Sequence, residues 1–84
     1  RPNSPMNNYR TIFKSSVVSV NYAMNEVVVK CYSGTAAAAA AAIDAMDISE
    51  IIGTVSGDDT ILVIAASEKD AAKLTELFRS FLDK

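Results

Sequence analysis

Hydrophobic and polar residues alternate near the start of the chain in a way that predicts two paired strands. The first strand lies within residues 12–22, where every second position of the central part is apolar. These apolar positions are Val18, Val20 and Tyr22. Residues 26–32 are rich in β-branched residues and predict a second strand. Met24 and Asn25 lie between the two segments and predict a tight turn, so the strands should form a hairpin.

The hydrophobic spacing changes to a helical period in two later segments. The first runs from about residue 36 to residue 46 and contains seven consecutive alanines, the residue with the highest helix propensity; Ser33 or Thr35 is expected to cap it. Its core face comprises Ala39, Ala42, Ile43 and Met46. The second helix begins at Ser67, with Asp70 placed as in a capping box. Its core stripe comprises Ala71, Leu74, Leu77, Phe78 and Phe81.

Two apolar runs, residues 51–52 and 61–64, flank a polar stretch that contains Gly57, Asp58 and Asp59. An apolar run, a glycine with acidic neighbours and a second apolar run predict another hairpin, with the acidic pair in or beside its turn. The fourth strand is apolar at nearly every position, which is typical of a strand that is covered on both faces.

The order β-β-α-β-β-α predicts an α/β fold of the two-layer α+β kind, in which two helices cover one face of a four-stranded, mostly antiparallel sheet. The other face still carries valines and isoleucines, so we expect it, or one edge of the sheet, to contact another subunit. Residues 1–14 are rich in proline and asparagine and are interpreted as a linker from an absent upstream domain. Residues 15–84 form the single folded domain.

Charge and cysteine content exclude some kinds of function for this chain. Net charge is −2, and from residue 31 onward four basic residues face nine acidic ones, so the folded part should not bind a phosphate backbone directly. The single cysteine, Cys31, excludes an internal disulfide and suits a cytoplasmic location. Its strand position two residues after Val29 favours a buried apolar role over that of a nucleophile. No membrane span is predicted.

The acidic pair has two interpretations from the residues alone. Aspartate and glycine are ordinary turn residues, so Asp58 and Asp59 need no ligand. However, adjacent like charges repel, and a guanidinium can hydrogen-bond both carboxylates at once. Asp44 has a similar ambiguity, because it is either a solvated helix charge or the end of a shallow alanine surface formed with Ala37 and Ala41.

Residues 53–60, with the sequence GTVSGDDT, resemble the G-T-x-x-G-D-D-T signature of the C-terminal domain of bacterial arginine repressors. The resemblance covers residues 16–84. It includes the valine-rich hairpin, the Ser33-Gly34 turn before an alanine-rich helix, and Asp44 at the corresponding distance past that glycine.

The resemblance implies a transcription regulator of arginine metabolism, not an enzyme, that has no metal and no cofactor other than L-arginine as effector. It implies a homotrimer that pairs into a homohexamer, with operator DNA bound only through an absent N-terminal winged-helix domain. L-arginine is expected between the trimers, with Asp58 and Asp59 on its guanidinium and Asp44 on its α-amino group. Thr54 and Ser56 match positions near the ligand. Backbone N–H groups of residues 34–36, at a helix start, are expected to bind the α-carboxylate.

One position departs from the family pattern. Many relatives have glutamine where this chain has Ala37, and alanine cannot hydrogen-bond the ligand. The loss is worth on the order of 1.5–3 kcal/mol, or about 10- to 100-fold in affinity. This departure leaves open an alternative function, a ligand-independent oligomerisation module of a divergent arginine-repressor paralogue.

Two further alternatives come from other classes. A carboxylate–Mg²⁺ hydrolase using Asp44, Asp58 and Asp59 is disfavoured by the lack of histidine, a nucleophile motif and a phosphate-binding loop. A small amino-acid-sensing domain of another α/β family would have similar elements, but the signature at residues 53–60 favours the repressor family.

Overall fold

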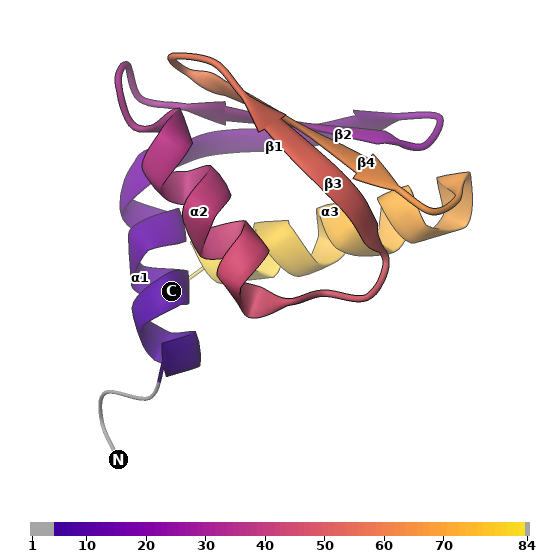
Figure 1. The fold of residues 1–84 in the computed structure, drawn as a ribbon, viewed down its shortest axis with the longest axis horizontal. Coiled ribbons are helices and arrows are strands. Elements are labelled where there is room, and N and C mark those ends of the chain that lie inside the picture. The colour runs from indigo at the N-terminus through magenta and orange to yellow at the C-terminus, as the bar shows by residue number, and fades with distance from the viewer. Residues whose placement is uncertain (1–4, 84) are drawn as a thin grey trace.

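The computed structural model describes residues 5–83, which form an antiparallel sheet covered on one face by helices (Figure 1). The elements are α1 (Pro5–Ser16), β1 (Val17–Ala23), β2 (Glu26–Cys31), α2 (Ala36–Met46), β3 (Ile51–Ser56), β4 (Thr60–Ala65) and α3 (Glu68–Leu82). The strand order is β1-β2-β4-β3, and each neighbouring pair is antiparallel. The predicted two-layer fold is therefore confirmed, as is the order β-β-α-β-β-α from β1 onward.

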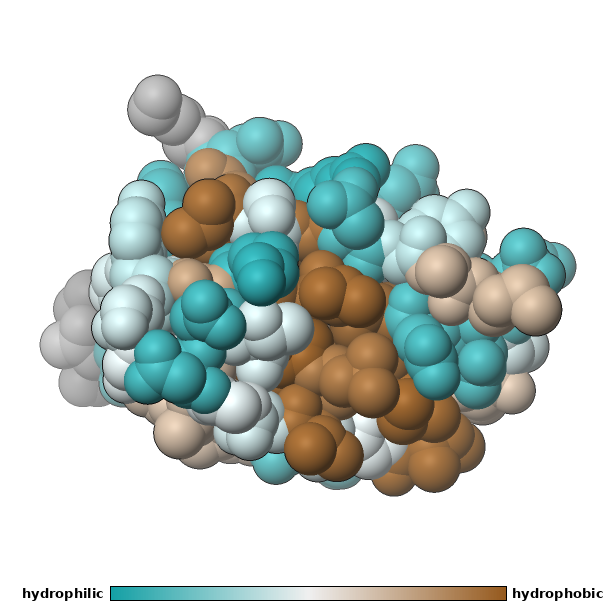
Figure 2. Space-filling model, turned by 90° about the horizontal axis from the view of Figure 1, so that it is seen from above, coloured by the Kyte–Doolittle hydropathy of each residue, from teal (hydrophilic) through white to brown (hydrophobic). Residues whose placement is uncertain are grey.

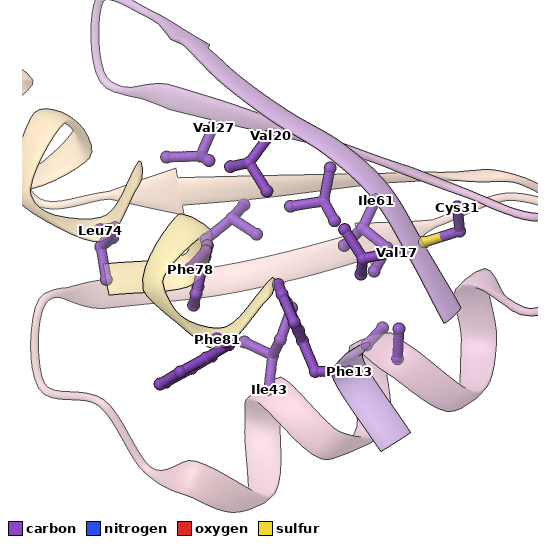
Figure 3. Close-up of a cluster of buried hydrophobic side chains, with 14 of the residues drawn as sticks. Phe13, Val17, Val20, Val27, Cys31, Ile43, Ile61, Leu74, Phe78 and Phe81 are labelled. Atoms are coloured by element: carbon purple, nitrogen blue, oxygen red, sulfur yellow. The ribbon is translucent and has the colours of Figure 1, made fainter. Parts of the chain in front are cut away.

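A helix, α1, forms where the composition predicted a linker, and the first strand begins at Val17. The Phe13 side chain is fully buried, and its ring lies 5.3 Å from that of Phe78 and 5.6 Å from that of Phe81 (Figure 3). Burial of an amphipathic face outweighs the weak helix propensity of the asparagines, which is why composition alone failed here. Residues 1–4 lie outside the described residues, and the linker to an upstream domain stays a prediction.

The sheet has a buried inner face and an open outer face. Val27 and Val29 of β2 and Ile61 and Val63 of β4 point inward and are fully buried. The residues that alternate with them along β4 are only half-buried. The sequence predicted that this strand is covered on both faces, but within this chain it is covered on one face only. The strict alternation arises because successive side chains of a strand point to opposite sides, and only one side carries helices.

The two predicted helix starts differ in how they are capped. The Ser67 hydroxyl accepts a hydrogen bond from the Asp70 N–H at 3.1 Å, as the capping box predicted. The Thr35 hydroxyl instead donates to the carbonyl of Tyr32 at 2.8 Å, so α2 begins without a side-chain cap. Helix α2 consequently owes its position to packing of its alanine face against the core, together with the high helix propensity of alanine.

Candidate functional site

Helix α2 and strand β3 lie side by side and run in opposite directions (Figure 1). A hydrogen bond connects the two elements, in which the Thr54 hydroxyl donates to Asp44 Oδ1 at 3.0 Å. Asp44 lies near the C-terminal end of α2, and Thr54 lies in the middle of β3. Because the two elements run in opposite directions, the C-terminal end of β3 lies near the start of α2. The fold therefore brings Asp44 into contact with a residue of the 53–60 signature.

The turn after β3 lies against the start of α2. The main-chain carbonyl of Asp58 accepts hydrogen bonds from the Gly34 N–H at 3.1 Å and the Ala36 N–H at 3.3 Å. Its carboxylate accepts a third from the hydroxyl of Ser33, with 3.0 Å between Oγ and Oδ2. Three donors from residues 33–36 thus hold one acidic residue of the turn.

Asp59 is held differently. Its Oδ1 accepts a hydrogen bond from the hydroxyl of the adjacent Thr60 at 2.9 Å, and the Lys30 ammonium donates to the same hydroxyl at 3.0 Å. The Asp59 main-chain carbonyl accepts from the Cys31 N–H at 2.7 Å, which fixes the turn to the end of β2. The side chain itself is exposed, so its carboxylate is accessible to a ligand.

The residues predicted to bind a ligand form a set that lies on α2, on β3 and in the turn after β3, and hydrogen bonds connect Asp44 to Thr54 and Asp58 to the segment before α2. We call this the α2–β3 strip; it comprises Ala37, Asp44, Thr54, Ser56, Asp58 and Asp59. Thr54 is half-buried and the other five residues are exposed. A ligand or a second protein chain therefore has access to the whole strip.

The strip does not enclose a pocket by itself. A cavity of about 130 Å³ beside Asp44 is lined by Asp47 and by apolar residues on either side of it, but not by Asp58 or Asp59. Among residues 5–83, no three acidic or cysteine side chains come close enough together to hold a metal ion. The three carboxylates required by the metal-hydrolase alternative are therefore not brought together within one chain.

The backbone donors differ from those expected. The N–H groups of Gly34 and Ala36 are bound to the Asp58 carbonyl and that of Thr35 to the Tyr32 carbonyl, so none of the three is free for a carboxylate. Within the described part of the chain, no hydrogen bond forms from the N–H of Ala37 or Ala38, which lie in the uncapped first turn of α2. The N–H groups that could bind an anion are therefore those of Ala37 and Ala38, one to two residues further along α2 than the predicted residues 34–36.

Sequence reasoning missed the roles of Ser33 and Lys30. Ser33 was expected to cap α2, but its hydroxyl donates to Asp58. The hydrogen bond from the Lys30 ammonium to the Thr60 hydroxyl was not predicted. No local pattern identifies either contact, because the partners are 25 and 30 positions apart in the sequence.

Cys31 takes the buried position that its spacing predicted. Its side chain is 6% exposed, and it faces the core from the end of β2 (Figure 3). Desolvation, and secondarily the negative charge of Asp59, raise the pKa of the thiol above its ordinary value. A thiol that stays protonated is a poor nucleophile, which supports a packing role.

The open face of the sheet carries a band of apolar side chains, which we call the outer apolar face (Figure 2). It comprises Val28, Ile52, Val55, Leu62 and Ile64. Val28 pairs with Leu62 and Leu62 with Val55, so three of them form a row across neighbouring strands. Ile52 is 70% exposed and Val55 is 67% exposed. Such a band is larger than the scattered apolar residues of an ordinary surface and marks an interaction site.

No helix within the described residues is both long and apolar enough to cross a membrane.

Comparison with known proteins identifies relatives for most of the chain. Residues 13–80 match the family described as "Arginine repressor, C-terminal domain". The chain is 49% identical over 71 residues to the arginine repressor of Alkaliphilus oremlandii, an alignment that covers 84% of this chain and 48% of the relative. It is 49% identical over 74 residues to that of Acetivibrio thermocellus, covering 88% and 48%. With the arginine repressor of Thermotoga petrophila, identity is 41% over 78 residues, covering 93% and 51%.

These matches agree with the resemblance inferred from residues 53–60. The chain spans about half the length of the curated relatives it matches. The relatives are named as repressors, a class of transcription regulators and not of enzymes.

Proposed function

Because this chain belongs to the arginine-repressor C-terminal domain family, we propose that it is the arginine-binding and oligomerisation domain of a transcription regulator of arginine metabolism. The observation that carries the proposal is the α2–β3 strip, in which three carboxylates are exposed along one junction without a pocket that encloses them. Such a strip is an incomplete site, and a second copy of the chain would complete it.

The chemistry of the strip matches that of L-arginine, which has two cationic groups and one carboxylate. Asp58 and Asp59 would accept hydrogen bonds from the guanidinium, whose planar fork suits two neighbouring carboxylates. Asp44, held by Thr54, would accept from the α-amino group. The unbound N–H groups of Ala37 and Ala38 at the start of α2 would donate to the α-carboxylate, where the helix dipole also favours an anion.

The outer apolar face and the acidic strip suggest two different interfaces between copies of the chain. We propose that the outer apolar face packs against other copies in a trimer, and that two trimers pair with their acidic strips at the interface. Carboxylates from two trimers would repel one another, and bound arginine would neutralise them. A ligand that binds the hexamer more tightly than the trimer must shift assembly toward the hexamer by linkage.

DNA binding is assigned to a separate domain. The chain covers about half of its relatives, and its part from residue 31 onward is acidic, which is unfavourable for contact with phosphate. We propose that operator DNA is bound through an N-terminal domain upstream of α1, in the cytoplasm, and that the geometry of the hexamer sets the spacing of these domains.

The experiment that tests the proposal is calorimetric titration of the purified chain with L-arginine and with L-citrulline. Citrulline keeps the shape of arginine and removes the guanidinium charge, so a site built on Asp58 and Asp59 should bind arginine and not citrulline. Equal binding of the two ligands would contradict the guanidinium assignment. Heat from neither ligand would contradict arginine binding altogether.

The second candidate function is a ligand-independent oligomerisation module, and Ala37 is the observation that favours it. Its methyl group is exposed on α2 and offers no hydrogen bond to a ligand. In that case the chain would assemble to the same extent with and without arginine, whereas the first proposal requires that arginine promote the hexamer. Sedimentation velocity with and without arginine distinguishes the two.

A charge placed on the outer apolar face should prevent assembly. Leu62 lies in the central row of this face, between Val28 and Val55, and Leu62→Glu would bury an unpaired carboxylate between subunits. We expect the variant to sediment as a monomer at concentrations where the unsubstituted chain is oligomeric. Leu77→Glu is the matched control, since Leu77, which the helical spacing wrongly placed in the core stripe, is 38% exposed on α3 in the opposite layer. Equal dissociation of both variants would show that the interface is not on this face.

A further inference from the structure

The carboxylate of Asp58 is held by a residue outside the 53–60 signature. Ser33 Oγ donates to Asp58 Oδ2 at 3.0 Å, across 25 positions of sequence. Asp44 and Asp59, in contrast, are bound by Thr54 and Thr60, which both belong to the signature. We propose that Ser33 is a positioning residue for arginine binding, and that it orients the Asp58 carboxylate toward the guanidinium. This inference rests on the proposed function.

Only the side chain of Asp58 needs a positioning group. Its main chain is already fixed, because the Asp58 carbonyl accepts hydrogen bonds from the N–H groups of Gly34 and Ala36. An exposed aspartate side chain on such a fixed backbone still exchanges among rotamers. The Ser33 hydroxyl selects the rotamer that places Oδ2 against the segment before α2.

The same contact leaves one carboxylate oxygen available. Among the residues that the structure describes, Asp58 Oδ1 has no hydrogen-bond donor, whereas Oδ2 is occupied by Ser33. A guanidinium N–H can therefore bind Oδ1 without displacing an internal hydrogen bond. Ser33 also connects the guanidinium end of the site to residues 33–36, which lead into the α2 donors proposed for the α-carboxylate.

The consequence is a pre-organised site in which arginine does not have to order Asp58 on binding. Loss of one neutral-to-charged hydrogen bond that orients a binding group should weaken arginine binding by about 2- to 10-fold. The effect should be smaller than that of removing the carboxylate charge itself. It should also depend on the Asp58 side chain, because a hydroxyl that acts only through Asp58 has nothing to position once that carboxylate is removed.

The test uses calorimetric titration of the 84-residue chain and its variants with L-arginine. Ser33→Ala should weaken binding about 2- to 10-fold, and Ser33→Thr, which keeps the hydroxyl, should restore it. In the Asp58→Ala background, which removes the acceptor of the Ser33 hydroxyl, Ser33→Ala should produce no further loss. Ser49→Ala is the matched control, since the Ser49 hydroxyl also donates to a nearby carboxylate, that of Glu50, away from the strip.

A ligand-free measurement tests the positioning directly. Three-bond NMR couplings of Asp58 should report one dominant χ1 rotamer in the unsubstituted chain and averaging in Ser33→Ala. Unchanged couplings, or unchanged arginine affinity in Ser33→Ala, would overturn the role of Ser33 while leaving arginine binding intact. An unsubstituted chain that binds no arginine would overturn the proposed function and this inference together.

Discussion

Replacement of Asp59 by asparagine should abolish arginine-dependent assembly and leave the fold intact. The substitution removes the negative charge that would face the guanidinium, and loss of a charged hydrogen-bond partner weakens binding by about 10- to 100-fold or more. The fold should tolerate it, because the introduced asparagine keeps a side-chain oxygen that can accept from the Thr60 hydroxyl. The main-chain contact from Cys31 to residue 59 is unaffected by the change.

The measurement is sedimentation velocity with increasing L-arginine, accompanied by calorimetric titration. Asp83→Asn is the control, because Asp83 is an exposed carboxylate at the end of α3 and lies outside the α2–β3 strip. It should respond to arginine as the unsubstituted chain does. An Asp59→Asn variant with unchanged arginine affinity would refute the assignment of Asp59 to the ligand.

Phe13→Ala should destabilise the domain more than any single change in the strip. The Phe13 ring is fully buried and contacts the rings of both Phe78 and Phe81, with which it forms an aromatic cluster joining α1 to α3. Truncation of a buried phenylalanine costs about 3–5 kcal/mol. A domain of this size has a total stability of roughly 4–13 kcal/mol, so this loss is a large share of the free energy of unfolding.

Urea unfolding followed by circular dichroism, at one fixed protein concentration, measures this effect. Ile12→Ala is the matched control, because Ile12 is the adjacent residue of the same helix and is 39% exposed. It should lower the free energy of unfolding by less than about 1 kcal/mol. Equal losses in the two variants would show that burial of the Phe13 ring contributes no more to stability than the partly exposed Ile12 side chain does.

Several elements of this fold can be predicted from the sequence because their signals are local. Alternating apolar residues predicted β1, β-branched residues predicted β2, and helical spacing of apolar residues predicted α2 and α3. The predicted inner face of β1 was wrong at Val18, which is 53% exposed while Val17 and Val20 are buried, because the register of β1 shifts between Val17 and Ser19. The apolar runs on either side of residues 57–59 define the second hairpin, and the structure has its turn there. In each case one face of the element is buried, so the period of the pattern directly reflects the secondary structure.

A ligand-binding role for the α2–β3 strip could be predicted only because residues 53–60 resemble a family signature. The residue types at 53–60 resemble a known family, and the match over residues 13–80 places the chain in that family. From the residues alone, Asp58 and Asp59 had two interpretations, as ordinary turn residues or as a cation site, and Asp44 was either a solvated helix charge or the end of an alanine surface. Their alignment along one junction depends on the antiparallel packing of α2 against β3, which no local pattern encodes.

The sequence by itself determined the strands, the two later helices, the acidic turn and the apolar character of the sheet. Only the tertiary structure decided that residues 5–16 form a helix, because burial of Phe13 against α3 outweighs an unfavourable local composition. It also decided that Ser33 contacts Asp58 and that a third helix, α1, joins α2 and α3 on the covered face of the sheet. These features depend on contacts between residues far apart in the chain, and such contacts form only when the elements pack together.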